Sequence, residues 1–90
     1  MQLPAIHMNG TSKGDLLEAA CDCRAAIQKA METVAHNGPN ARDYYVLGGS
    51  YYDVAMREHM DRLTRLRKLV EEFDEIVDGI DAGGHYAQKP

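Results

Sequence analysis

The fold is decided by residues 51–80, which read YYDVAMREHMDRLTRLRKLVEEFDEIVDGI. Apolar and aromatic side chains, with one histidine among them, recur here at alternating steps of four and three residues: Tyr52, Met56, His59, Leu63, Leu66, Val70, Phe73, Val77 and Ile80. This spacing is typical of the face by which one α-helix packs against another. The stretch therefore predicts a long helix over 51–80, capped at its start by Ser50.

A second helix is predicted over residues 13–36. Its apolar positions also alternate in steps of four and three, and they are Leu16, Ala20, Cys23, Ile27, Ala30 and Val34. Ser12 supplies an N-cap with Asp15 three residues later, and the sequence Asn-Gly-Pro at 37–39 ends the helix. The two predicted helices give an all-α fold, an antiparallel hairpin.

The remaining segments carry the signals of irregular structure. Residues 1–12 contain Pro4 and an Asn-Gly turn at 9–10, so they are expected to form an irregular N-terminal arm. Residues 37–50 form the loop between the helices, and their length is typical of functional loops. Residues 81–90 are expected to form a flexible tail.

Composition indicates that one hairpin cannot bury a large apolar core by itself. Leu, Ile, Val and Phe together supply 17 of the 90 residues, which is too few for a large core within one chain. A two-helix hairpin also leaves part of each apolar stripe in water. We therefore expect a homo-oligomer.

Charge and hydropathy limit the classes of partner and the location expected for this chain. The net charge is −4, and six of the fourteen acidic residues lie in the last twenty positions, which disfavours binding to duplex DNA. No apolar run is long enough to span a membrane, and the first residues do not resemble a signal peptide. Cys21 and Cys23 are poorly placed to pair with each other on a helix, which favours reduced thiols and a cytoplasmic location.

Two polar segments are candidate binding motifs. The first places His7, Asn9, Thr11 and Ser12 before a helix N-terminus, where free backbone N–H groups attract anions. The alternative is a plain turn followed by an N-cap.

The second segment lies in the loop and contains Asn40, Arg42, Tyr44 and Tyr45, with two further tyrosines at 51 and 52. Aromatic rings beside an arginine suit a flat, phosphorylated ligand. In the alternative interpretation, Arg42 and Asp43 pin the loop while the tyrosines pack on the helix ends.

His59 occupies a packing position of the second helix. A buried histidine with a hydrogen-bond partner is one interpretation, and a ligand contact or pH switch is the other. Four pairs spaced i,i+4 (Glu58–Arg62, Asp61–Arg65, Arg67–Glu71 and Lys68–Glu72) suggest a solvated face. Their basic members could instead line an anion pocket between chains.

Catalysis and metal binding are not expected. The Cys-x-Cys pair at 21–23, taken with His36 or His59, lacks the ligand spacing of a zinc site. No nucleophile elbow, phosphate-binding loop or dinucleotide fingerprint is present. The sequence therefore predicts a non-enzyme without cofactor or metal.

Several of these residues resemble a family. His7, residues 9–12, residues 39–45 and residues 57–59 are similar to motifs of small uncharacterised proteins of tailed phages and prophages, over about residues 6–78. The resemblance carries no settled activity. In architecture alone, the predicted hairpin resembles phage proteins that oligomerise and sequester cyclic-nucleotide immune signals.

These observations lead to two functional hypotheses. The first is a phage-type accessory protein of the host cytoplasm that binds a small anionic, nucleotide-derived ligand at chain interfaces, as an anti-defence protein would. Asn9, Thr11 and Ser12 would donate hydrogen bonds, and antiparallel pairing of chains would bring them beside the neighbour's loop. The alternative is a structural or protein-interaction accessory (virion, packaging or host-factor binding) without any small ligand.

Overall fold

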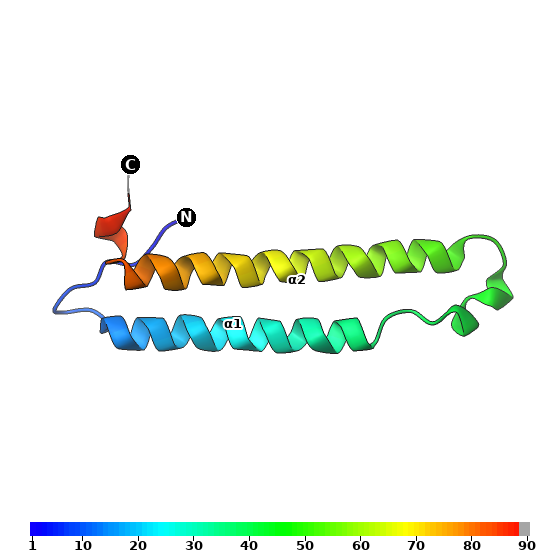
Figure 1. Cartoon of the computed structure of the whole chain (residues 1–90), viewed down its shortest axis with the longest axis horizontal. Helices are drawn as coiled ribbons and strands as arrows, with labels where there is room; N and C mark the ends of the chain where they lie inside the picture. The colour runs from blue at the N-terminus through cyan, green and yellow to red at the C-terminus, as the bar shows by residue number, and fades with distance from the viewer. Residues whose placement is uncertain (89–90) are drawn as a thin grey trace.

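A computed structural model describes residues 1–88 as a hairpin of two long antiparallel helices (Figure 1). The long helices are α1 (Lys13–His36) and α2 (Tyr51–Asp81), and three short 3-10 helices are η1 (Ala41–Asp43), η2 (Tyr45–Leu47) and η3 (His85–Ala87). An isolated bridge between Ala5 and Gly84 is the β-type pairing in this part of the chain. The predicted all-α hairpin is confirmed.

Both ends of α1 follow the predicted capping signals, whereas the start of α2 does not. The Ser12 hydroxyl accepts a hydrogen bond from the Asp15 backbone N–H at 3.1 Å, as predicted. Asn37 closes α1 by donating its backbone N–H to carbonyls of the last turn. Ser50 occupies the N-cap position of α2, but its side chain makes no capping hydrogen bond, so this predicted contact is wrong. α2 ends at Asp81, one residue beyond the predicted bound.

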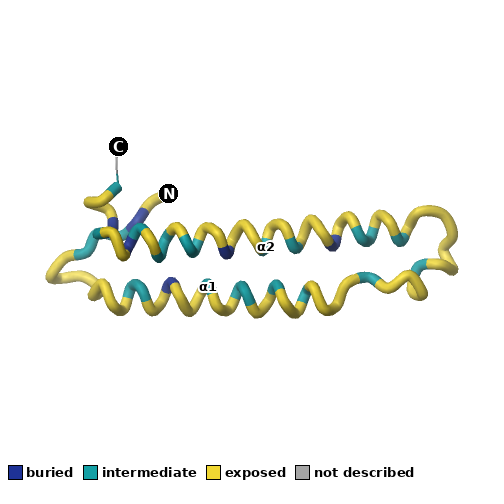
Figure 2. The backbone as a smooth tube through the Cα atoms, in the orientation of Figure 1, coloured by how far each residue is buried: buried dark blue, intermediate teal, exposed yellow. Residues whose placement is uncertain are grey.

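The packing face of α2 is the predicted one. Each of its nine spaced positions is at least half-buried, and His59, Val70 and Ile80 are buried (Figure 2). The alternating steps of three and four keep these side chains on one side of the helix, which packs against α1 and, beyond the end of α1, against the loop.

The packing face of α1 is rotated from the predicted one. Cys23 and Ala30 are exposed, whereas Arg24 and Met31 lie on the packed side. Both differences have a physical reason. Met31 offers more apolar surface than an alanine, and the Arg24 guanidinium pairs with the Asp74 carboxylate across the hairpin. The sequence spacing did not select the observed register, because that register contains the charged Arg24 and because Ala30 and Met31 both fit a helical stripe.

Residues 82–88 differ from the expected free tail, because they fold back onto the N-terminal arm. The His85 backbone N–H donates to the Pro4 carbonyl at 2.8 Å, and the Gln88 side chain hydrogen-bonds the backbone of Leu3 and Met1. The arm lies against the end of α2, where Leu3 is 8% exposed. The other two residues of the predicted tail, 89–90, lie outside the described residues.

The hairpin is long and thin. Its extents are 62 × 25 × 15 Å and its radius of gyration is 19.0 Å, against about 12 Å for a compact chain of 90 residues. Its accessible surface is 6655 Å², against about 5,200 Å² expected of a compact 10.0 kDa monomer. Within residues 1–88, no helix is long and apolar enough to cross a membrane. The core is therefore a single narrow seam.

Candidate functional site

The two polar motifs lie at opposite ends of the hairpin. The arm enters α1 at the end where the chain termini meet, and residues 37–50 form the far tip (Figure 1). The 24 residues of α1 alone separate the motifs by about 36 Å. Within one chain, the motifs therefore cannot form the shared site.

The N-terminal motif has the geometry of a turn followed by a cap. The Gly10 backbone N–H donates to the His7 carbonyl at 3.2 Å, and the His7 ring lies over Gly10. Ser12 uses its hydroxyl to cap α1. Asn9 and Thr11 are exposed on the surface of this turn. The motif therefore presents two polar side chains to solvent beside a histidine, and its serine is occupied by the helix.

At the tip, the loop is held by its own backbone and by Asn40. The Asn40 side-chain oxygen accepts from the Arg42 backbone N–H at 3.0 Å, which starts η1. Gly48 and Gly49 follow η2 with φ of 71° and 60°. Among residues 1–88, no carboxylate pairs with the Arg42 guanidinium. The start of the loop is thus held by the Asn40 cap, and the alternative interpretation, in which Arg42 pins the loop, gains no ion pair in residues 1–88.

The tyrosines of the tip divide into an inner and an outer pair. Tyr44 and Tyr52 are half-buried, with ring centroids 6.0 Å apart and planes tilted by 56°. Tyr45 and Tyr51 are mostly exposed. A hollow of about 410 Å³ lies among Ala41, Tyr44, Tyr45, Gly48, Gly49, Tyr52 and Asp53. The charged side chain in this lining is the carboxylate of Asp53, which disfavours a phosphate there.

The other side of the tip is apolar and open. Val46 and Leu47 are 73% and 58% exposed, although η2 holds their backbone in place. Leu47, Tyr51 and Val54 line a hollow of about 280 Å³ that continues along α2 toward Glu58 and Arg62. Exposed aliphatic side chains in a structured turn favour contact with another protein surface.

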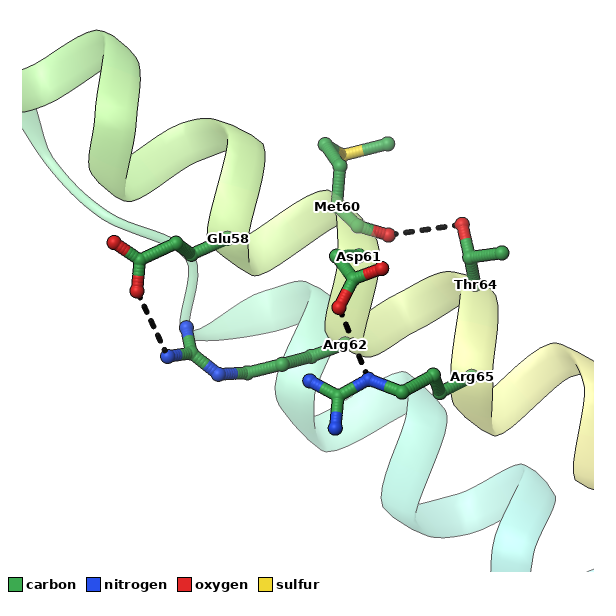
Figure 3. A network of polar contacts seen from close by, with 6 residues as sticks. All are labelled: Glu58, Met60, Asp61, Arg62, Thr64 and Arg65. Carbon is green, nitrogen blue, oxygen red and sulfur yellow. Dashed lines mark hydrogen bonds and ion pairs between the residues drawn. The ribbon is translucent and has the colours of Figure 1, made fainter.

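Beyond the tip, α2 presents a ladder of charged side chains (Figure 3). Arg62 pairs with Glu58 at 3.5 Å and Arg65 pairs with Asp61 at 3.1 Å, as their spacing predicted. A shallow hollow of about 480 Å³ lies along this ladder and also includes Arg57. The predicted pairs of Arg67 with Glu71 and Lys68 with Glu72 do not form in the described part of the chain.

His59 belongs to the seam between the helices. Its side chain is buried at 7% exposure, and a Cβ added to Gly38 would lie 3.0 Å from its Nε2 atom. Gly38 is thus the small residue that lets the loop pass over the imidazole. This position favours a packing role for His59 over direct ligand contact.

The cysteines and the acidic residues form no evident metal centre. Cys21 and Cys23 are both free and exposed on α1. Over residues 1–88, no group of three or more His, Cys, Asp and Glu side chains is arranged to hold a metal ion.

Comparison with protein-family models, with curated proteins and with solved structures found no match to this chain.

Proposed function

We propose that this chain is a non-enzymatic accessory protein that works by protein association, first of all with copies of itself. The observation that carries the proposal is the surface of 6655 Å², about 1,400 Å² more than a compact chain of this mass exposes. A standard protein interface removes about 800 Å² from each partner. The excess surface is therefore large enough for a full interface.

The exposed side chains support the same proposal. Large apolar residues that a monomer would normally cover lie open on the tip and along α2; they include Tyr45, Val46, Leu47, Tyr51, Met60 and Leu69. Only Leu3, Ala20, Val70 and Ile80 are buried apolar residues among those described. So thin a core favours a chain that gains stability by assembling.

Sedimentation of the purified chain across micromolar concentrations tests this proposal. We expect a species of at least twice the chain mass, and melting temperatures that rise with concentration. A folded, monodisperse monomer would overturn the proposal.

A ligand-binding function is the second candidate. It is favoured by two features of the tip: the Arg42 guanidinium, which no described carboxylate neutralises, and the tyrosine-lined hollow of about 410 Å³, whose lining includes the neighbouring residue Ala41. Such a volume suits a nucleotide-sized molecule, and a second chain would have to complete the anion site because Asp53 lines the hollow. The phage-type, anti-defence setting of this candidate comes from the sequence resemblance.

A melting-shift screen with cyclic nucleotides separates the two candidates. A binder gains thermal stability with one of them, and an association module gains none. In the binder, Arg42→Ala removes the shift while helicity stays unchanged, because a charge-assisted hydrogen bond contributes about 1.5–3 kcal/mol.

A further inference from the structure

One face of the hairpin carries apolar groups that the seam leaves uncovered. On α1 this face displays the exposed small residues Ala19, Cys23, Ala26 and Ala30, and on α2 it displays the half-buried Leu66 and the exposed Leu69. We call these six residues the alanine–leucine face. Ala26 and Ala30 stand two turns and one turn before Val34, so they share its side of α1. Val34, Leu66 and Leu69 line one hollow of about 440 Å³ together with Arg62 and Arg65 of the charged ladder, which places both helices' contributions on one face.

We infer that the alanine–leucine face is where a second copy of this chain packs, antiparallel to the first, to form a four-helix bundle. This inference rests on the self-association proposed above and names its surface and orientation. A helix in such a bundle contacts two neighbours and so needs two adjacent apolar stripes. α1 has both, one packed against α2 and the other exposed through Cys23 and Ala30.

Side-chain size favours a helical occupant. Small residues on α1 allow the α1 helix of a second copy to approach closely, and Leu69, 40% exposed on α2, meets the α2 helix of that copy. A two-fold axis that crosses the helices at right angles places α1 against α1 and α2 against α2, so both copies use the same face.

The charge distribution along α2 favours an antiparallel orientation. Residues 51–70 carry five basic and three acidic side chains, whereas residues 71–81 carry six acidic and no basic ones. An antiparallel partner places the basic half of one α2 near the acidic half of the other. A parallel partner would bring the two acidic segments to the same end of the bundle, where Asp74 and Asp81 are each paired within their own chain but the other four carboxylates have no ion-pair partner in residues 1–88, which is unfavourable.

The face is tested by a matched pair of charge insertions at adjacent exposed alanines. Ala26→Glu places a carboxylate within the alanine–leucine face, whereas Ala25→Glu places one on another side of α1. Sedimentation should show that Ala26→Glu raises the dissociation constant by ~tenfold or more, with helicity retained. Ala25→Glu should leave the constant nearly unchanged, because its carboxylate stays in water.

These outcomes separate failure of the face from failure of self-association. A monomeric wild-type chain would overturn both proposals. A dimeric wild type that tolerates Ala26→Glu as well as Ala25→Glu would overturn only the face.

The orientation is tested by thiol cross-linking in a Cys21→Ser, Cys23→Ser background. Chains carrying Glu58→Cys are mixed with chains carrying Ala19→Cys and treated with a short bifunctional maleimide. An antiparallel pair links the two different chains, because the tip half of one chain lies beside the end of the other chain where its termini meet. Links between two Glu58→Cys chains would instead show a parallel pair and overturn the orientation.

The salt dependence of the dissociation constant tests the same orientation independently. Ions screen charges beyond about 10 Å at 0.1 M and beyond about 3 Å at 1 M. The dissociation constant of the antiparallel pair should therefore rise as salt increases, because opposite charges attract across it. A constant that falls with salt would indicate like charges in contact and contradict the antiparallel arrangement.

Discussion

At the scale of single residues, the end of the hairpin where the chain termini meet depends on two glycines. A Cβ on Gly79 would overlap Leu3 Cδ1, so the arm packs directly on the α2 backbone. A Cβ on Gly84 would overlap the Pro4 carbonyl oxygen, and Gly84 also has a φ of 72°. These contacts lie between residues about eighty positions apart, which explains why local signals in the sequence predicted a free tail.

Gly79→Ala tests this contact, because two effects of opposite sign compete. Alanine favours a helix interior over glycine by about 1 kcal/mol, whereas expelling Leu3 forfeits about 1.5–3 kcal/mol of apolar burial. We expect Gly79→Ala to lower the free energy of unfolding by about 1 kcal/mol in urea titrations. In a Leu3→Ala background, the same change should raise it. Destabilisation of similar size in both backgrounds would show that Leu3 does not rest on Gly79.

At the scale of elements, the sequence was most informative where apolar spacing and caps agree. The start and end of α1 and the packing face of α2 follow directly from their patterns. The rotation of α1 was missed, because Ala30 and Met31 both fit a helical stripe and only the contact with α2 selects between them. The long α2 projects beyond α1, and the tip spans this difference with two 3-10 turns.

The candidate site was less predictable than the helices. Tyr44 and Tyr52 could be proposed from composition, but their pairing required the turn geometry of the tip. The separation of the two polar motifs follows from helix length alone. In the sequence, the spacing of Arg62 and Arg65 from their acidic partners predicted ion pairs on a solvated face. The structure shows that the hollow along Arg57, Arg62 and Arg65 adjoins the hollow of about 280 Å³ at the tip.

The fixed shape of the tip is testable with glycine replacements. Gly48 has φ 71° and ψ 178°, a conformation that is nearly restricted to glycine, so Gly48→Ala should cost about 1–3 kcal/mol. Gly14 lies in the first turn of α1, and a methyl group added there would meet no atom within 4 Å, so Gly14→Ala should gain about 0.5 kcal/mol. Thermal unfolding of both variants measures the contrast. An unchanged Gly48→Ala melting temperature would mean that the tip does not hold this turn.

At the scale of the whole molecule, the hairpin resembles half of a bundle. Its radius of gyration of 19.0 Å and its exposed apolar side chains have one common cause, which is that two helices cannot enclose the stripes they carry. Antiparallel pairing would cover part of these stripes. It would also move the end of each hairpin where the termini meet toward the tip half of its partner. The two polar motifs, separated within one chain, would then approach each other between chains.

Mixing variant chains tests whether the motifs cooperate in the ligand-binding candidate. If each site joins Asn9 of one chain to Arg42 of its partner, neither Asn9→Ala nor Arg42→Ala chains alone give a melting shift with the nucleotide. In an equal mixture, half of the dimers are mixed, and each mixed dimer keeps one intact site of its two. Binding should therefore return to about a quarter of the wild-type capacity, measured by calorimetric titration. Full binding by Asn9→Ala chains alone would contradict the shared site, because the tip would then bind the ligand without the arm.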